Sequence, residues 1–280
     1  MSRPPARRSP LARDRYALYE ASVQGPGYDL DVFERVWRTV RGGRFRTLRE
    51  DFCGTAQLAC AWAERRPANR ALGIDLDARV LEWARAQHVA RMGRAAPRVR
   101  LLRRDVRTVT RPVVDVVAAL NFSWWVLKER AELRRYFRAV RRSLRPRGLF
   151  FMHLFGGTQA LDRLVETRRV APSTGPDGLR IPGFTYVWEQ AAFNPVDHRL
   201  LSHIHFRFPG KDEMRRAFSY DWRMWTLPEA REVLAEAGFR SSAVYVEGWD
   251  HHRHAPDDVF RRRERFANQY GWLAYVVGVA

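Results

Sequence analysis

The sequence predicts a doubly wound α/β fold built on a seven-stranded, mostly parallel sheet that carries an antiparallel β insertion. Three observations predict it. Short apolar strands alternate with amphipathic helices between residues 47 and 155, which is typical of right-handed crossovers in a parallel sheet. The run 113–120 is apolar throughout, as a strand buried on both faces requires. Residues 157–222 replace this alternation with a hairpin pattern. The fold class is therefore Rossmann-like.

Each element has its own local signal. Apolar residues between Tyr16 and Val40 predict two short helices, interrupted at 24–27 by Gln-Gly-Pro-Gly. Strands are expected at 47–52, 71–75, 99–102, 113–120 and 149–155, and helices at 55–65, 78–90 and 133–144. Strands at 185–193 and 200–208 are expected to pair across a turn at 194–197. A helix then begins at 227 and is capped at Gly238, and strands follow at 242–247 and 272–279. The run 261–265 has the spacing of a helix with a solvated basic face.

The elements group into five segments along the chain. We expect a disordered basic leader at 1–13, a helical cap at 14–44, an α/β core at 45–156, a β-rich insertion at 157–222 that acts as a substrate lid, and the rest of the core at 223–280. A chain of 280 residues can bury a core of this size without a disulfide or a metal.

Charge and cysteine content bound the partners and the compartment. Lys and Arg number 50 against 31 Asp and Glu, a formal net charge of +19. A polyanion partner would explain this excess, but the arginines are scattered and only Lys128 and Lys211 are lysines, so a solvated basic surface is favoured. Two cysteines, Cys53 and Cys60, make no disulfide framework or metal quartet. With no apolar run of signal or membrane-span length, we expect a cytoplasmic protein.

Polar and small residues follow four of the predicted core strands. In open α/β sheets ligands bind outside the carboxyl ends of the strands, so these positions form the candidate ligand site. They are Glu50-Asp51-Phe52-Cys53-Gly54-Thr55-Ala56, Asp75 in Gly73-Ile74-Asp75-Leu76-Asp77, Asp105, and Asn121-Phe122-Ser123-Trp124-Trp125.

The chemistry at these ends favours an adenosine-containing ligand without a pyrophosphate. A carboxylate at Asp75 can accept from both ribose hydroxyls, and Asp77 is the better helix N-cap of the two acids. The first turn has only Gly54 where a dinucleotide site needs three glycines, so a nicotinamide dehydrogenase is disfavoured.

In these features the chain resembles the class I S-adenosylmethionine (SAM)-dependent methyltransferases, over residues 45–156 and 225–280. The Glu-Asp-Phe-Cys-Gly-Thr-Ala turn further resembles that of a bacterial subgroup of this family. Phe52 and Ala56 depart from the family, where glycines are common at these two positions. The resemblance implies a methyl transfer from SAM, leaving S-adenosylhomocysteine, by in-line displacement to an acceptor.

The resemblance also implies the cofactor contacts. Glu50 and the backbone of Cys53, Gly54, Thr55 and Ala56 would face the methionine part, with Phe52 in the same turn; Asp75 and Leu76 would face the ribose, Asp105 and Val106 the adenine, and Asn121 and Phe122 the route to the transferred methyl. No catalytic base is assigned, although His153 near the end of the fifth strand is a candidate, against the alternative of a core histidine.

Aromatic residues are the candidates for an acceptor pocket. The candidates are Tyr16, Tyr19, Trp124, Trp125, Tyr186, Trp188, Trp222 and Trp225. For each of them, the alternative is a packing role in the core or in the insertion. No metal site is expected, because Asp250-His251-His252-Arg253-His254 lacks a ligand spacing and is better explained as a solvated loop.

Three functions remain open at this point. A methyltransferase acting on a small molecule is favoured, because an aromatic insertion can roof a compact pocket. An RNA or protein methyltransferase is the alternative, suggested by the basic charge and by Trp124 and Trp125, which the sequence places near the surface. A non-catalytic SAM-binding protein of the same fold is the third.

Overall fold

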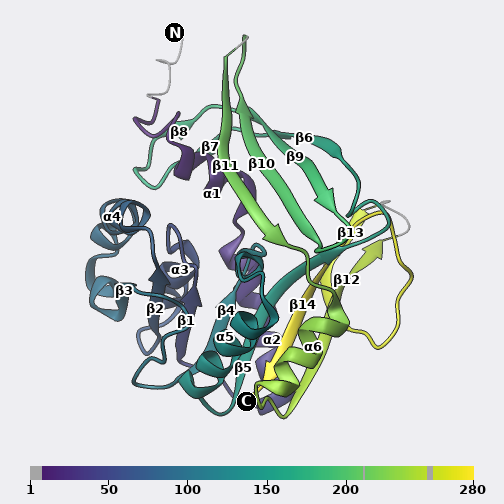
Figure 1. Ribbon diagram of the computed structural model, residues 1–280. Coiled ribbons are helices and arrows are strands. Elements are labelled where there is room, and N and C mark those ends of the chain that lie inside the picture. The colour runs from purple at the N-terminus through teal and green to yellow at the C-terminus, as the bar shows by residue number, and fades with distance from the viewer. Residues whose placement is uncertain (1–7, 211, 251–254) are drawn as a thin grey trace.

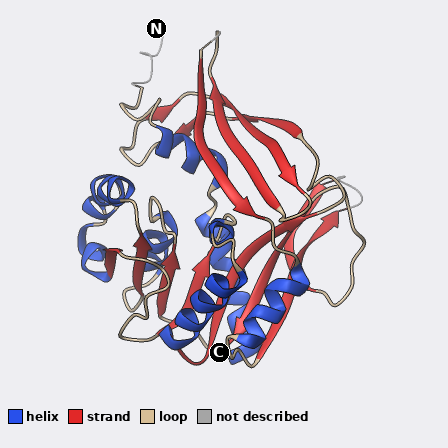
Figure 2. Cartoon of the chain, in the orientation of Figure 1, coloured by secondary structure: helices blue, strands red, loops and turns tan. Residues whose placement is uncertain are grey.

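A mixed sheet of eight strands forms the centre of the protein (Figures 1 and 2). The structure is a computed structural model that describes residues 8–210, 212–250 and 255–280. The strand order is β13-β12-β14-β5-β4-β1-β2-β3. The strands are β1 (Thr47–Asp51), β2 (Arg70–Asp75), β3 (Val99–Arg103), β4 (Val114–Ala119), β5 (Leu144–Gly156), β12 (Ser241–Asp250), β13 (Ala255–Arg262) and β14 (Trp272–Val279).

The predicted fold class is confirmed, with one strand more than expected. Strands β1 to β5 pair in parallel, whereas β14, β12 and β13 pair antiparallel in succession beyond β5. The eighth strand, β13, includes Arg261 and Arg262, so the helix expected at 261–265 is wrong. This strand lies at the sheet edge, where one side needs no partner and a polar sequence is tolerated.

Helices cover both faces of the sheet, as the alternation of buried residues along β5 requires. Leu149 and Phe151 pack with the helices of one face, whereas Phe150 and Met152 pack with those of the other. The first face carries α2 (Pro26–Arg41), α3 (Gln57–Arg65) and α4 (Ala78–Gln87), and the second α5 (Arg130–Ser143) and α6 (Leu227–Glu236). In the described ranges, no helix is long and apolar enough to cross a membrane.

The insertion forms a separate antiparallel sheet that stands over the carboxyl ends of the core strands (Figure 1). Its order is β11-β10-β9-β6, with a two-stranded ribbon of β7 and β8 beside it. The predicted hairpin is confirmed, because β9 and β10 pair antiparallel, but β6 and β11 were not predicted. The strands are β6 (Leu164–Val170), β7 (Ser173–Thr174), β8 (Arg180–Ile181), β9 (Phe184–Asn194), β10 (Arg199–Arg207) and β11 (Glu213–Arg223).

The N-terminal segment joins the two sheets. Helix α1 (Arg15–Val23) packs Ala17 and Leu18 into the apolar cluster of the insertion, whereas α2 packs onto the core. The expected leader is wrong for its second half, because Ser9 is buried and donates its N–H to the Arg180 carbonyl at 2.9 Å. Residues 1–7 lie outside the described residues. The helical cap therefore bridges insertion and core.

Candidate active site

The turn after β1 holds three residues in the left-handed backbone region. Phe52, Gly54 and Ala56 have φ angles of 53°, 51° and 57°. A side chain at such an angle is strained, so the angle persists only where the surroundings impose it, and residues strained in this way are concentrated at functional sites. No atom lies within 4 Å of the place where a Cβ of Gly54 would be, so the turn faces open space there.

Asp75, at the end of β2, is fixed beside this turn. Its carboxylate accepts the backbone N–H of Gly54 at 2.8 Å and that of Asp77 at 2.9 Å. Each oxygen keeps acceptor capacity for a ligand hydroxyl. The next residue, Leu76, is 62% exposed, an apolar surface beside the carboxylate that an aromatic base could cover. Asp77 is the N-cap of α4, accepting the N–H of Arg79 at 2.9 Å.

Glu50 lies buried beneath the same turn. Its carboxylate accepts the N–H of Ala59, in the first turn of α3, at 2.9 Å. Burial raises the pKa of Glu50 to about 8. The hydrogen bond from Ala59 lowers this pKa, whereas the nearby carboxylates of Asp29, Asp75 and Asp51 raise it. Glu50 is therefore mostly protonated at neutral pH and would ionise if a cation were bound beside it.

The end of β3 differs from what the resemblance implies. The Asp105 carboxylate is held by the Arg107 guanidinium, with its oxygens 2.6 to 3.1 Å from Nε and Nη2, and this pairing lowers the pKa of Asp105. The Val106 side chain is buried, and its carbonyl accepts from Arg49 at 2.7 Å. Much of the acceptor capacity of Asp105 is thus already used by Arg107.

A buried ion pair connects these strand ends. Arg49 and Asp51 pair at 2.6 Å with fully buried side chains, and Tyr136 donates to the same carboxylate at 2.8 Å. Arg49 also donates to Thr108, Thr110 and Ser143. The guanidinium therefore fixes the loop after β3 to the end of β1, a role that its place in an apolar strand pattern did not reveal.

The turn after β4 is also left-handed. Asn121 and Phe122 have φ angles of 50° and 59°. The N–H of Asn121 donates to Nδ1 of His153 at 3.2 Å, and Nε2 of His153 lies 3.5 Å from the Asp29 carboxylate. His153 is buried and does not line the cavity described next, so it is placed to position the turn rather than to act as a base.

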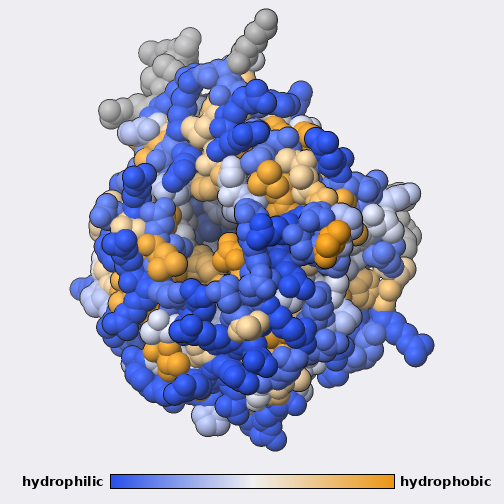
Figure 3. All heavy atoms as spheres, viewed as in Figure 1, coloured by the Kyte–Doolittle hydropathy of each residue, from blue (hydrophilic) through white to orange (hydrophobic). Residues whose placement is uncertain are grey.

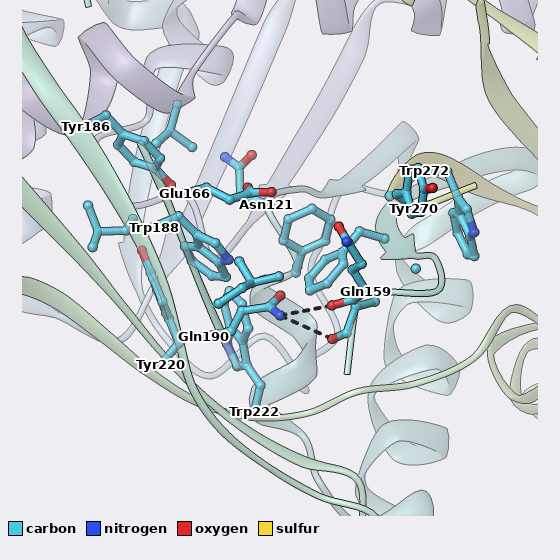
Figure 4. Close-up of a pocket in the computed structure, with 18 of the residues that line it drawn as sticks. Asn121, Gln159, Glu166, Tyr186, Trp188, Gln190, Tyr220, Trp222, Tyr270 and Trp272 are labelled. Atoms are coloured by element: carbon cyan, nitrogen blue, oxygen red, sulfur yellow. Dashed lines mark hydrogen bonds between the residues drawn. The ribbon is translucent and has the colours of Figure 1, made fainter. Parts of the chain in front are cut away.

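A cavity of about 360 Å³ opens between this turn and the insertion sheet. The space-filling view shows the face hollowed between insertion and core (Figure 3), and Figure 4 shows the lining side chains. The core contributes Asn121, Phe122, Phe155 and Gly156, and α1 contributes Tyr19 and Val23. The insertion, the segment before β14 and the first residue of β14 supply the rest, which are Gln159, Ala160, Leu164, Glu166, Tyr186, Trp188, Gln190, Ile204, Tyr220, Trp222, Tyr270, Gly271 and Trp272.

One face of the insertion sheet makes most of the wall. Tyr186, Trp188 and Gln190 alternate along β9, so period-two geometry brings them to the same face. Tyr220 and Trp222 do the same on β11, where their rings stack with centroids 4.4 Å apart. The amide of Gln190 donates to the Asp162 carbonyl at 2.8 Å and is thereby fixed at one end.

The structure divides the predicted pocket residues into two groups. Tyr19, Tyr186, Trp188 and Trp222 line the cavity. The others are packing residues. Tyr16 lies between Trp83 and Phe218, with ring centroids 5.6 and 6.2 Å away.

Three tryptophan candidates prove to be packing residues, and the surface position expected for two of them, Trp124 and Trp125, is wrong. Trp124 and Trp125 are fully buried, and Trp124 donates to the His153 carbonyl at 2.8 Å. Trp225 is also buried and donates to the Leu127 carbonyl at 3.1 Å. The indoles of Trp124 and Trp225 thus have internal acceptors, whereas the equally buried Trp125 has none among the described residues. The expected exposure of Trp124 and Trp125 is therefore wrong, and neither side chain offers a surface to RNA or to a protein.

Several lining residues were missed by the sequence analysis. Glu166, Gln190 and Tyr220 were not singled out, although Gln190 and Tyr220 continue the alternation that includes Tyr186, Trp188 and Trp222. Extending that alternation by one step on each strand would have identified Gln190 and Tyr220. The sequence 251–254, interpreted above as a solvated loop, lies outside the described residues; among those described, no group of three or more potential ligands could hold a metal.

Comparison with known proteins agrees with this architecture. Residues 53–150 match a family described as a methyltransferase domain. The sequence matches no curated protein. The predicted relationship to methyltransferases is thus supported over residues 53–150, from the turn after β1 into β5.

Solved structures resemble the whole chain at low sequence identity. A SAM-bound amino pentose methyltransferase from Micromonospora echinaspora, involved in calicheamicin biosynthesis, aligns with a TM-score of 0.65 and 20% identity over 94% of this chain and 95% of that one. A sugar N-methyltransferase from Streptoalloteichus sp. aligns with a TM-score of 0.62 and 19% identity over 100% and 97%. The CcbJ methyltransferase from Streptomyces caelestis gives 0.62 and 17% over 93% and 98%. Residues 53–150 thus correspond to a methyltransferase domain, and the chain as a whole has the fold of the SAM-dependent methyltransferases.

Proposed function

We propose that this protein is a SAM-dependent methyltransferase that transfers a methyl group to a small-molecule acceptor bound in the cavity between core and insertion. The observation that carries the proposal is the position of Asn121 and Phe122. They belong to the strand-end turns where SAM is expected, and they also line the cavity. A donor on the core and an acceptor in the cavity would therefore meet at this turn.

The strand ends fit SAM. Gly54 leaves open space beside the β1 turn, Asp75 offers acceptors for two ribose hydroxyls, and exposed Leu76 offers a surface for the adenine. Glu50 would take the ammonium of the methionine part as its carboxylate ionises. Bound there, SAM would supply a methyl group on a positively charged sulfur, and in-line displacement would transfer that methyl group to the acceptor.

The chain's own contribution is alignment and exclusion of water. The insertion sheet stands over the carboxyl ends of the strands (Figure 1), and its aromatic face walls a cavity of about 360 Å³. Small-molecule sites are commonly 300–1,000 Å³ in volume and mostly apolar with a few polar groups, and a cavity of about 360 Å³ falls at the lower end of that range. Holding the acceptor next to the donor makes the displacement effectively unimolecular.

The small-molecule acceptor is also consistent with the neighbours named above as amino pentose and sugar methyltransferases. An RNA or a protein acceptor would have to reach a methyl group that lies under the insertion sheet. The buried positions of Trp124 and Trp125 remove the aromatic surface that favoured such an acceptor.

Isotope-labelled SAM tests the proposal. Calorimetry should give a micromolar affinity for SAM or S-adenosylhomocysteine. With cell extract as acceptor source, label should enter the small-metabolite fraction. Absence of binding to either ligand contradicts a methyltransferase and a SAM-binding protein alike, and binding without transfer would indicate the non-catalytic alternative. Incorporation into RNA that falls steeply as salt rises from about 50 to 200 mM would show a nucleic-acid acceptor instead.

A further inference from the structure

The cavity differs in charge from the rest of the protein. Lys and Arg make up 50 of the 280 residues, yet none of the residues that line the cavity is Lys, Arg or His. One of them, Glu166, carries a negative charge. A cavity lined by one acidic side chain and no basic one favours a cation and disfavours a phosphate or carboxylate ligand.

Glu166 is placed to use that charge. In the pairing of β6 with β9 it lies directly opposite Trp188, so the two side chains share the face that lines the cavity. Figure 4 draws it beside Tyr186 and Trp188, in the same part of the view as Asn121. Among the described residues it makes no ion pair and no side-chain hydrogen bond. The nearest candidate, Arg168, instead lies over the Tyr186 ring, 5.4 Å from its centroid, and donates to the Ser22 carbonyl.

Aromatic faces complete the environment of the carboxylate. Trp188 lies opposite the exposed Glu166 on the neighbouring strand, Tyr186 lies diagonally to it opposite Arg168, and the stacked pair Tyr220 and Trp222 continues the wall. Trp188 lies 6.2 Å from Tyr220 and 6.1 Å from Trp222, between ring centroids. Aromatic rings around one carboxylate are an arrangement that attracts organic cations, because the ring faces carry negative potential.

From these observations we infer that the acceptor is a basic amine, held as its ammonium ion by Glu166 and the aromatic wall, and that its nitrogen receives the methyl group. This inference rests on the proposed function and specifies its substrate class. It also gives Glu166 the role of selecting the acceptor by charge.

The reaction balances with groups already named. The ammonium gives one proton to the Glu166 carboxylate, which leaves a lone pair on the nitrogen. That lone pair forms the new N–C bond while the C–S bond of SAM breaks and its electron pair remains on sulfur. The positive charge thus moves from sulfur to the N-methylated amine, and the proton on Glu166 passes to solvent.

A matched pair of probes tests the charge selection without SAM. Benzylamine, which is protonated at pH 7, and benzyl alcohol, which is neutral and of similar size, are titrated into the full-length protein by calorimetry. We expect the amine to bind about tenfold more tightly than the alcohol. In Glu166→Gln the preference should fall to about threefold or less, whereas Glu166→Asp should retain part of it.

Asp162→Asn is the matched control, because Asp162 is an exposed acid close in sequence that does not line the cavity. It should leave the preference unchanged. Equal binding of amine and alcohol by the wild-type protein, or an equal loss in Asp162→Asn, would overturn the inference. So would a loss of SAM affinity in Glu166→Gln as large as the loss for benzylamine, because the carboxylate would then serve the donor. None of these results touches the proposed function, which fails only if SAM is not bound or its methyl group is not transferred to a small molecule.

Discussion

The imidazole of His153 accepts the backbone N–H of Asn121 at Nδ1, across 3.2 Å. Because Nδ1 accepts, the ring proton is on Nε2, which lies 3.5 Å from the Asp29 carboxylate without a hydrogen bond to it. Asp29 in turn accepts from the Tyr275 hydroxyl. The hydrogen bond from Asn121 to His153 thus fixes the left-handed turn where donor and acceptor would meet, and the ring that accepts it lies beside polar groups of α2 and β14.

Removing this support should weaken turnover more than cofactor binding. We expect His153→Ala to lower kcat by about 10- to 100-fold, since small misplacements of reacting groups carry penalties of this size. SAM affinity should change by less than about threefold, because Asp75 and the β1 turn remain. His153→Asn, whose amide oxygen can take the place of Nδ1, should restore part of kcat. Equal activity of the Ala and Asn variants would contradict the positioning role, and thermal unfolding of both variants controls for stability.

The two acids after β2 should separate in a binding experiment. Asp75→Ala removes the acceptor for the ribose hydroxyls and also the partner of Gly54, so we expect at least a tenfold loss of SAM affinity, from about 1.5–3 kcal/mol per charged hydrogen bond. Asp77→Ala removes a helix cap and should cost about 1 kcal/mol of stability with SAM affinity retained. Calorimetry with SAM and urea unfolding of both variants distinguish the effects, and an equal loss of affinity would refute the assignment of Asp75.

Glu50 should make the protein less stable as the pH rises. Its folded pKa, about 8, lies above the ordinary value of 4.5, so between these values the folded state binds more protons than the unfolded state. The stabilising contribution is complete below about pH 4.5 and is lost as the pH rises toward 8, on the order of a few kcal/mol. Glu50→Gln keeps an acceptor for Ala59 and removes the ionisation, so the variant should be more stable than the wild type at pH 8.

The same substitution should impair SAM binding. If the ammonium of SAM pairs with ionised Glu50, wild-type affinity should weaken as the pH falls below 8, by up to about tenfold per pH unit. Glu50→Gln should bind weakly and with little pH dependence. Urea unfolding and SAM titrations at pH 6, 7 and 8 measure both effects. A wild-type affinity that is constant over this range would show that Glu50 does not ionise on binding.

The strand ends of the core could be predicted because their signals are local. Asp75, Gly54 and Asn121 follow apolar runs whose length and composition mark buried parallel strands, and the topology of such a sheet brings those ends together. The cap of α4 at Asp77 follows from the same local pattern.

Elements at sheet edges and the fate of single aromatics could not be predicted in this way. Strand β6 is exposed along most of its length, so no apolar alternation marks it, although it carries Glu166. Trp124 and Trp225 are buried, and the carbonyls of His153 and Leu127 accept their N–H groups. Such partners are distant in sequence, and only tertiary packing decides whether a tryptophan lines a pocket or fills a core.

The left-handed turn after β1 offers a last test, based on two alanines of the same helix region. Ala56 and Ala59 are both fully buried, so Ala→Gly removes the same buried methyl group at each. Ala56 has a φ of 57°, at which an L side chain is strained by about 1–2 kcal/mol, and glycine relieves this strain. Ala59 lies inside α3, where glycine instead costs about 1 kcal/mol. We therefore expect Ala59→Gly to lower the free energy of unfolding by about 2 kcal/mol more than Ala56→Gly does, as measured by urea unfolding. Equal losses in the two variants would mean that Ala56 is not strained, so that replacing it by glycine relieves nothing.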